Sequence, residues 1–120
     1  MSASVIPALR QILLQIRQLG EHLLPYAAEL DPENVTCVRE HAVHSIHFLD
    51  EVNADPTRSM ESREVRHDFR NKIGAVRGSS ELMLMELPSS HVVTPALRQI
   101  VVLSNQVLAH LDSIREAAAG

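Results

Sequence analysis

A histidine, an acid, an arginine and an asparagine lie together at His67, Asp68, Arg70 and Asn71. Neutral imidazole is a nucleophile, and an adjacent carboxylate that accepts its ring N–H fixes the tautomer and raises that nucleophilicity. Asn71 follows His67 by one helical turn, and its amide can hold a water molecule or an oxyanion. Arg70 and Lys72 flank the histidine and could attract an acidic partner or a phosphoryl group. These residue types predict group transfer through His67.

On a helix of about 100° per residue, His67 lies almost opposite an apolar stripe. The residues of the stripe are Val65, Phe69, Ile73, Val76 and Met83. Asn71, Gly74 and Gly78 share the outward face with His67, one, two and three turns further on. A glycine inside a helix costs about 1 kcal/mol relative to alanine, and close approach of another protein is a reason to accept that cost. We therefore expect His67 to be exposed, with a strip of small residues for docking beside it.

The order and spacing of these residues resemble the H-box of the dimerisation and histidine phosphotransfer domain of sensor histidine kinases. The matching residues are His67-Asp68-Phe69-Arg70-Asn71, Ile73, Val76, Arg77-Gly78 and Glu81-Leu82. The resemblance covers about residues 60–118. It implies an antiparallel helical hairpin that pairs with a second copy to make a four-helix bundle.

The resemblance also implies roles for single residues. His67 would be phosphorylated on a ring nitrogen, Asp68 would act as general base, and Asn71 would help to place the water that dephosphorylates the partner. That partner would be a response-regulator receiver domain, which docks beside the histidine and supplies Mg²⁺ and the acceptor aspartate. A cognate histidine kinase is a second expected partner. The expected docking residues are Arg70, Lys72, Gly74, Arg77 and Gly78.

The sequence departs from the family's pattern in three places. Lys72 stands where proline is usual, so we expect a helix that is less kinked below His67. Ser79-Ser80 replaces a more typical aromatic and alanine pair. The asparagine box and glycine-rich boxes of the family's ATP-binding domain do not occur in the 120 residues, and neither does a G-x-x-x-x-G-K motif. We expect no autokinase activity from this chain alone and no cofactor bound by it.

Helix-start signals and apolar spacing predict an all-α chain of four helices. Three helix starts are marked by an N-cap residue before a proline, at Asp31-Pro32, Asp55-Pro56 and Thr94-Pro95. The first helix begins near Ser4 and ends or kinks at Pro25, and the third stops at Pro88. The last helix has a seam spaced by three and four residues, typical of a helical bundle: Leu97, Ile100, Ser104, Val107, Leu111, Ile114 and Ala118.

We expect residues 1–54 to form a helical pair and residues 55–120 to form the phosphotransfer-type hairpin, and the two parts can pack as one domain. A hairpin with an apolar seam cannot bury that seam alone. We therefore expect a homodimer whose four-helix bundle contains two hairpins. In the alternative, the first two helices cover the seam within one chain.

Composition excludes several classes of protein. The net charge of −4 argues against general nucleic-acid binding. The single cysteine excludes an internal disulfide and fits a reducing compartment. No apolar run approaches the roughly 18 residues of a membrane span. We expect a cytoplasmic protein that binds neither nucleic acid nor membrane.

A second cluster of chemically active residues lies on the second helix, where Cys37, His41 and His44 share one face. Cysteine and histidine at this spacing could ligate Zn²⁺ or another soft metal. The alternative is a partly apolar packing face with histidines at its rim. The spacing is common in helices and no second pair of ligands is evident, so we favour the packing face and predict no metal site.

Three functions remain open. The first is a phosphoryl relay between His67 and a receiver aspartate. The second is a non-catalytic dimerisation or adaptor module at the N-terminus of a larger signalling protein with a receiver or cyclase output. The third is a metal-sensing helix bundle. Asp68 and Asn71 favour the relay, because an adaptor needs neither residue.

Overall fold

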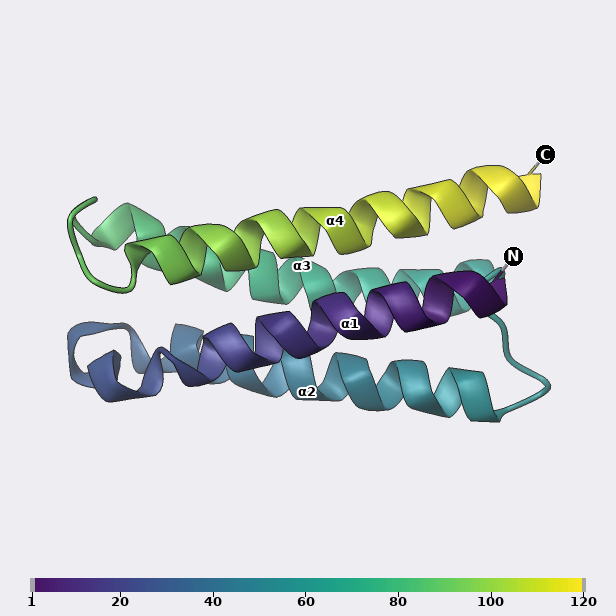
Figure 1. Cartoon of the computed structure of the whole chain (residues 1–120), viewed down its shortest axis with the longest axis horizontal. Helices are drawn as coiled ribbons and strands as arrows, with labels where there is room; N and C mark the ends of the chain where they lie inside the picture. The colour runs from purple at the N-terminus through teal and green to yellow at the C-terminus, as the bar shows by residue number, and fades with distance from the viewer. Residues whose placement is uncertain (1, 120) are drawn as a thin grey trace.

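The computed structural model describes residues 2–119, and within these residues the chain is helical without strands. Four long helices and one short 3₁₀ helix follow one another: α1 (Ser2–Glu21), η1 (Leu24–Glu29), α2 (Pro32–Ala54), α3 (Arg63–Glu86) and α4 (Thr94–Ala119). The long helices lie side by side and run alternately in opposite directions (Figure 1). The all-α prediction is confirmed, and the arrangement fits a four-helix bundle.

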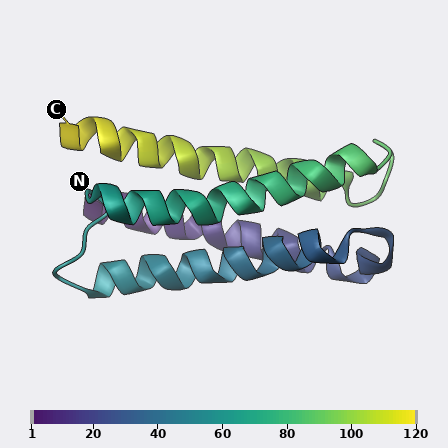
Figure 2. The same cartoon turned by 180° about the vertical axis from the view of Figure 1, so that it is seen from behind.

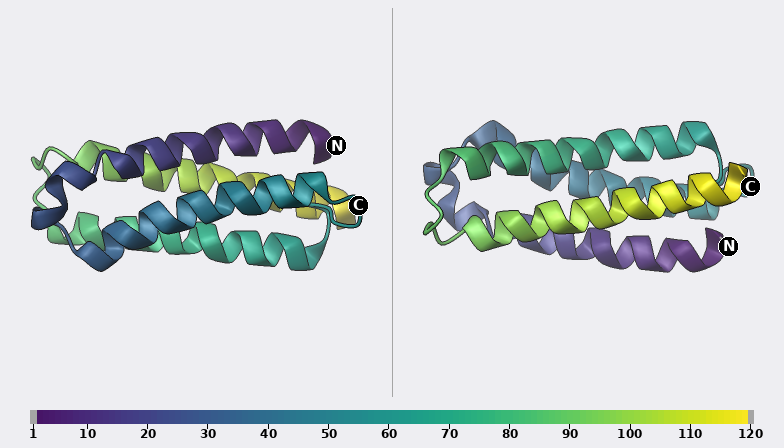
Figure 3. Two further views of the ribbon diagram at one scale, coloured as in Figure 1. Left: turned by 90° about the horizontal axis from the view of Figure 1, so that it is seen from below. Right: turned by 90° about the horizontal axis from the view of Figure 1, so that it is seen from above.

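Each long helix packs against two neighbours. The helix α1 contacts α2 and α4, and α3 contacts the same two helices from the other side. In Figure 2, α3 runs across the front with α4 and α2 on either side of it, and Figure 3 shows the remaining two sides. The starts of α1 and α3 and the end of α4 lie at one end of the elongated molecule, and η1 lies at the other (Figure 1). The site around His67 is therefore at the end where α1 begins.

One hydrophobic core runs through all four long helices and joins the two halves predicted from the sequence. The predicted seam of α4 is buried from Leu97 to Ile114, whereas Ala118 is exposed. The other helices of the same chain cover this seam. This burial fits the alternative in which the first two helices cover the seam, so the seam by itself does not require a homodimer.

The start of α2 agrees with the sequence prediction. Asp31 is the N-cap, and its Oδ1 accepts hydrogen bonds from the backbone N–H groups of Glu33 at 2.9 Å and Asn34 at 3.2 Å. Pro32 occupies the first helical position, where a missing N–H costs nothing. This helix begins where its capping residue predicts.

The helix start predicted at Asp55-Pro56 is wrong. Asp55 ends α2 instead, and its Oδ1 accepts hydrogen bonds from the N–H of Thr57 at 2.9 Å and from the Thr57 hydroxyl at 2.6 Å. An aspartate that binds its own backbone two residues on makes a turn as readily as a cap, so the dipeptide is ambiguous. The helix α3 begins after Ser62, whose Oγ accepts from the N–H of Val65 at 3.4 Å.

The first helix begins at Ser2 and contains Pro7 within its first turns. It ends at Glu21, and the chain around Pro25 tightens into η1, in agreement with the break that the proline predicts.

The last helix starts at Thr94, as predicted. The Thr94 hydroxyl donates to the carbonyl of Pro88 at 3.1 Å and so stabilises the turn that precedes the helix. Within residues 2–119, no helix combines the length and the apolar character needed to cross a membrane.

Candidate functional site

His67 is the fifth residue of α3, and its side chain is exposed. The opposite stripe of the helix is buried, as its spacing predicts, with Phe69, Ile73 and Val76 fully inaccessible. The imidazole Nε2 lies 3.4 Å from Nδ2 of Asn71, one turn further along the helix. An amide nitrogen can only donate, so this contact favours the tautomer in which Nε2 carries the lone pair. That nitrogen is the nucleophilic one.

Asp68, the expected partner of the ring N–H, does not reach the ring. Its side chain is exposed, and in the described part of the chain the hydrogen bond of the His67 ring is with Asn71. Neighbouring residues on a helix point about 100° apart, whereas residues four apart face each other. The helical spacing therefore gives the orienting role to Asn71.

Four arginines surround a hollow on the surface next to His67. Its lining residues are Arg63, Glu64, Arg66, His67, Arg70 and Arg115, and its volume is about 570 Å³. We call this feature the arginine hollow. Four of the chain's eleven basic residues meet here, although the whole chain has a net charge of −4. Guanidinium groups bind phosphoryl and carboxylate oxygens in fork geometry, so the hollow suits an anion held beside the imidazole.

Two of these arginines are held by hydrogen bonds, and a third lies at the outer limit of ion-pair distance from a carboxylate. Arg66 is buried, and its Nη1 donates to the carbonyl oxygens of Met60 and Glu61 in the turn before α3. Arg70 Nη2 donates to Asp112 Oδ1 at 2.9 Å, and Nη2 of Arg115 lies 4.0 Å from the same oxygen. Asp112 on α4 thus binds Arg70 and lies close to Arg115.

The sequence interpretation missed Arg63, Arg66 and Arg115. The first two share a side of α3 with Arg70, and the spacing of three and seven residues is a signal that could have found them. Arg115 comes from α4, so its place depends on how the two helices are aligned. That alignment is visible in a second contact: Arg77 Nη1 donates to Asn105 Oδ1 at 3.0 Å.

The glycines lie where the sequence predicts them. A Cβ atom added to Gly74 or Gly78 would meet nothing within 4 Å outside its own helix and nearest neighbours, so both face open space. The same outward face of α3 continues to two exposed apolar side chains, Leu82 at 51% and Met85 at 81% exposure. Together with His67 and Asn71 these residues form one continuous strip along α3. The gap left by the glycines and the apolar end of the strip suit contact with another protein.

The remaining docking candidates lie on two different sides of α3. The Lys72 Nζ lies 4.7 Å from the ring centroid of Phe48 on α2, so Lys72 packs at the α2–α3 side and does not join the arginine hollow. Arg77 lies on the α4 side, where its Nε is also 3.3 Å from Glu81. Arg70 is the one docking candidate among the residues that line the arginine hollow.

The Cys37 cluster on α2 does not have the arrangement of a metal site. His41 Nδ1 lies 2.9 Å from the backbone oxygen of Cys37 and 3.5 Å from its Sγ, while the His44 ring stands edge-on at 6.3 Å between centroids. Within residues 2–119, no three His, Cys, Asp or Glu side chains are placed to hold a metal ion. The partly buried Cys37 also donates to the carbonyl of Ala75 on α3 at 3.6 Å, in keeping with a packing face.

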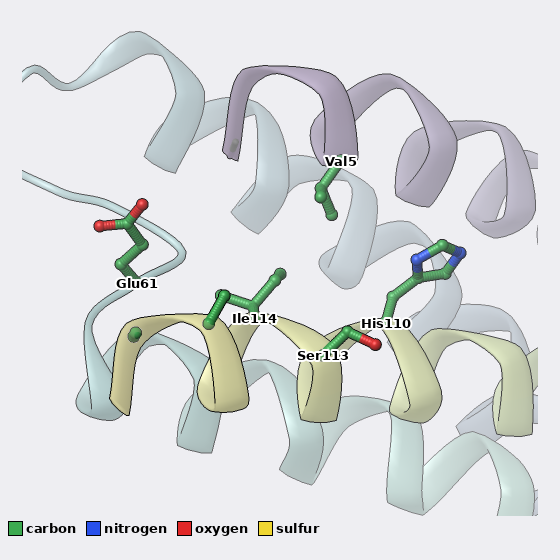
Figure 4. Close-up of a pocket in the computed structure, with 7 residues that line it drawn as sticks. Val5, Glu61, His110, Ser113 and Ile114 are labelled. Atoms are coloured by element: carbon green, nitrogen blue, oxygen red, sulfur yellow. The ribbon is translucent and has the colours of Figure 1, made fainter. Parts of the chain in front are cut away.

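A second hollow lies at the same end of the molecule, between α1 and α4. Figure 4 shows Val5 on α1 facing Ile114, His110 and Ser113 on α4, with Glu61 to one side. Glu61 therefore faces this hollow with its side chain, while its backbone oxygen accepts from Arg66 of the arginine hollow.

Charge is divided unevenly between the two halves of the molecule. Residues 1–54 contain three arginines and seven acidic residues, whereas residues 55–120 contain eight basic and eight acidic residues. The whole net charge of −4 therefore belongs to the part that forms α1 and α2. The side that carries His67 is neutral on balance, with four of its eight basic residues at the arginine hollow.

Comparisons with protein-family models, with curated proteins and with solved structures find no match for this chain. What supports a function is the site itself. It combines an exposed imidazole with an adjacent amide, an arginine-lined hollow and an open strip for a partner.

Proposed function

We propose that the chain passes a phosphoryl group between His67 and an aspartate of a receiver domain in a two-component signalling pathway. The observation that carries the proposal is the exposed imidazole of His67 at the edge of the arginine hollow. Phosphoryl transfer needs an aligned nucleophile and positive charge around the moving group more than it needs covalent chemistry from the protein. The exposed imidazole and the four arginines beside it support the proposal on both counts.

In the loading direction, a phosphorylated receiver transfers its phosphoryl group to the histidine. The lone pair of Nε2 forms a bond to phosphorus while the bond between phosphorus and the aspartyl oxygen breaks. The electron pair of the broken bond stays on the carboxylate, and Nδ1 keeps its proton, so the imidazole becomes a phosphorylated cation. Asn71 then moves aside from Nε2 and can donate to a phosphoryl oxygen. The reverse reaction passes the group on.

The strip along α3 is the proposed docking surface for the receiver. Gly74 and Gly78 let another backbone approach the helix beside the histidine, and Leu82 and Met85 offer apolar contact further along. A third hollow, lined in part by Arg77 and Asn105, opens between α3 and α4 next to this strip. An acidic receiver surface would therefore meet both apolar and basic groups.

The proposed working unit is a single-chain four-helix bundle in the cytoplasm. The apolar seam of α4 is already covered within the chain, so a second copy is not required to bury it. A homodimer would have to use another surface. The receiver would supply the Mg²⁺ and a cognate histidine kinase would supply the phosphoryl group. We propose that the chain has no autokinase activity of its own.

An adaptor without chemistry is the second candidate, because the exposed Leu82 and Met85 would support docking of a partner even without phosphoryl transfer. The two functions are distinguished by incubating the chain with a phosphorylated receiver and Mg²⁺. A relay gives an acid-labile phosphoryl group on the wild-type chain and none on His67→Gln. Docking of the receiver without label on the wild-type chain would establish the adaptor and contradict the relay.

A further inference from the structure

One carboxylate of α4 lies beside two arginines of the arginine hollow. Asp112 Oδ1 accepts from Arg70 Nη2 at 2.9 Å and lies 4.0 Å from Arg115 Nη2. All three side chains are partly open to solvent, with exposed fractions of 44% for Asp112, 37% for Arg70 and 62% for Arg115. Ion pairs this exposed contribute little to stability, so they separate readily.

The two arginines also face the place where an anion would arrive. Arg70 and Arg115 line the arginine hollow together with His67, whereas Asp112 is outside its lining. A phosphoryl group carries nearly two negative charges and three acceptor oxygens, which makes it a stronger partner for guanidinium groups than a single carboxylate. It would therefore compete with Asp112 for both arginines.

We propose, on the basis of the proposed function, that Asp112 is a resting counter-ion and that Arg70 and Arg115 exchange it for the phosphoryl oxygens on His67. Arg115 is then a positioning residue supplied by α4. The exchange keeps the positive charge of the arginine hollow paired before the group arrives. It also lowers the affinity for the anion, because the Asp112 carboxylate competes with the phosphoryl oxygens for Nη2 of Arg70 and for the charge of Arg115.

A purely structural tie between α3 and α4 would have different properties. Arg77 and Asn105 already join these helices at 3.0 Å, seven residues along from Arg70 on α3 and seven back from Asp112 on α4. This second contact uses a neutral amide, which shows that a tie needs no carboxylate. If the pair only joined the two helices, removing either residue would weaken that contact in the same way. If Asp112 is a counter-ion, its removal should strengthen anion binding, whereas removal of the arginine should weaken anion binding.

The experiment uses the whole chain with two probes. Potassium phosphoramidate loads histidine directly: Nε2 bonds to phosphorus, the bond between phosphorus and nitrogen breaks, and ammonia leaves. Inorganic phosphate is titrated separately and followed by the NMR signals of the His67 ring. We expect Asp112→Asn to raise the rate of loading and the affinity for phosphate, and Arg115→Gln to lower both, each by roughly threefold to tenfold.

The control pair lies on the opposite side of the molecule. Arg10 Nε and Asp50 Oδ1 form an ion pair at 3.0 Å between α1 and α2, with exposures of 44% and 46%. Arg10→Gln and Asp50→Asn change the net charge in the same ways and should leave both measurements within twofold of wild type. Arg115→Lys keeps the charge without the fork and should fall between wild type and Arg115→Gln.

The outcomes separate this proposal from the proposed function. Opposite effects of Asp112→Asn and Arg115→Gln support the exchange, whereas effects in the same direction, or no effect, overturn it. If the wild-type chain is not phosphorylated at His67, the relay fails, and the titration with inorganic phosphate still decides whether Asp112 and Arg115 oppose each other. Circular dichroism of the variants confirms that each remains folded.

Discussion

The amide nitrogen of Asn71 lies 3.4 Å from Nε2 of His67, one helical turn away. The expected role of Asp68 in holding the ring is thereby taken by a neutral residue. A neutral donor directs the tautomer without adding negative charge, so it does not repel an incoming phosphoryl group.

This contact leads to a prediction about Asn71. In Asn71→Ala we expect the His67 ring to lose its bias toward the tautomer protonated on Nδ1, because the donor to Nε2 is gone. The change is measured from the ¹⁵N chemical shifts of the imidazole. Phosphorylation of His67 should persist, while the receiver should lose its phosphoryl group more slowly if Asn71 places the attacking water. Asn53→Ala, at an exposed position of α2, is the control; an unchanged tautomer in Asn71→Ala would contradict the prediction.

The phosphoacceptor itself should be dispensable for folding. His67→Gln removes an exposed side chain, so the free energy of unfolding should change by no more than about 0.5 kcal/mol. Urea denaturation of the two proteins measures the difference. A loss of several kcal/mol would mean that the imidazole is part of the packing, and the loss of phosphorylation in this variant would then have a trivial cause.

Gly78 offers a matched pair of substitutions. Gly78→Ala should raise the free energy of unfolding by about 0.5–1 kcal/mol, because alanine is the better helix former and the added Cβ meets nothing within 4 Å. Gly78→Leu should fold equally well but bind the receiver more weakly, since its side chain fills the docking strip. Receiver affinity is measured by calorimetry. Equal affinity for Gly78→Leu and wild type would place the docking surface elsewhere.

The buried seam gives a prediction about assembly. Leu111→Ala should destabilise the single chain by about 2–5 kcal/mol, because Leu111 is fully buried and its loss leaves a cavity. Leu82→Ala, at an exposed position of the neighbouring helix, should have little effect. The unfolding midpoint of the wild type should be independent of protein concentration over a hundredfold range. A midpoint that rises with concentration would restore the homodimer expected from the sequence.

Asp55 predicts a dependence of stability on pH. The hydroxyl of Thr57 and then its backbone N–H donate to Asp55, which lowers the pKa of this carboxyl below its usual value of 3.8. The carboxylate therefore stabilises the fold at pH values above 3.8, and this contribution disappears as the pH falls through the lowered pKa. The difference in unfolding free energy between wild type and Asp55→Asn should be constant from pH 5 to 7 and shrink in stronger acid. A difference that grows in acid would have the wrong sign.

The spacing of apolar residues was enough to predict the long helices and their buried faces. Every predicted core residue from Val65 to Met83 on α3 is buried, because a periodic stripe records which side of a helix meets the core. The ambiguity at Asp55-Pro56 could not be resolved in the same way. The same side chain can cap a helix or close a turn, and the choice depends on the residues that pack against it.

The site was predictable only as far as it lies on one helix. The outward position of His67, Gly74 and Gly78 follows from helical geometry alone. The position of Arg115 beside His67 depends on how α4 is aligned with α3. The sequence positions of Arg70 and Asp112 do not reveal this alignment. Lys72 was placed at the site from its proximity in sequence, whereas its position about 140° around the helix from His67 directs it to Phe48.

The uneven division of charge has a kinetic consequence. With the excess of negative charge on the side of α1 and α2 and four arginines gathered on the opposite side, the molecule has an electric dipole across its long axis. The field of this dipole orients an acidic partner before contact, so that the partner meets the side of the molecule that carries His67 first. Added salt should therefore slow association while it leaves dissociation nearly unchanged, because screening acts on the approach more than on the closed interface.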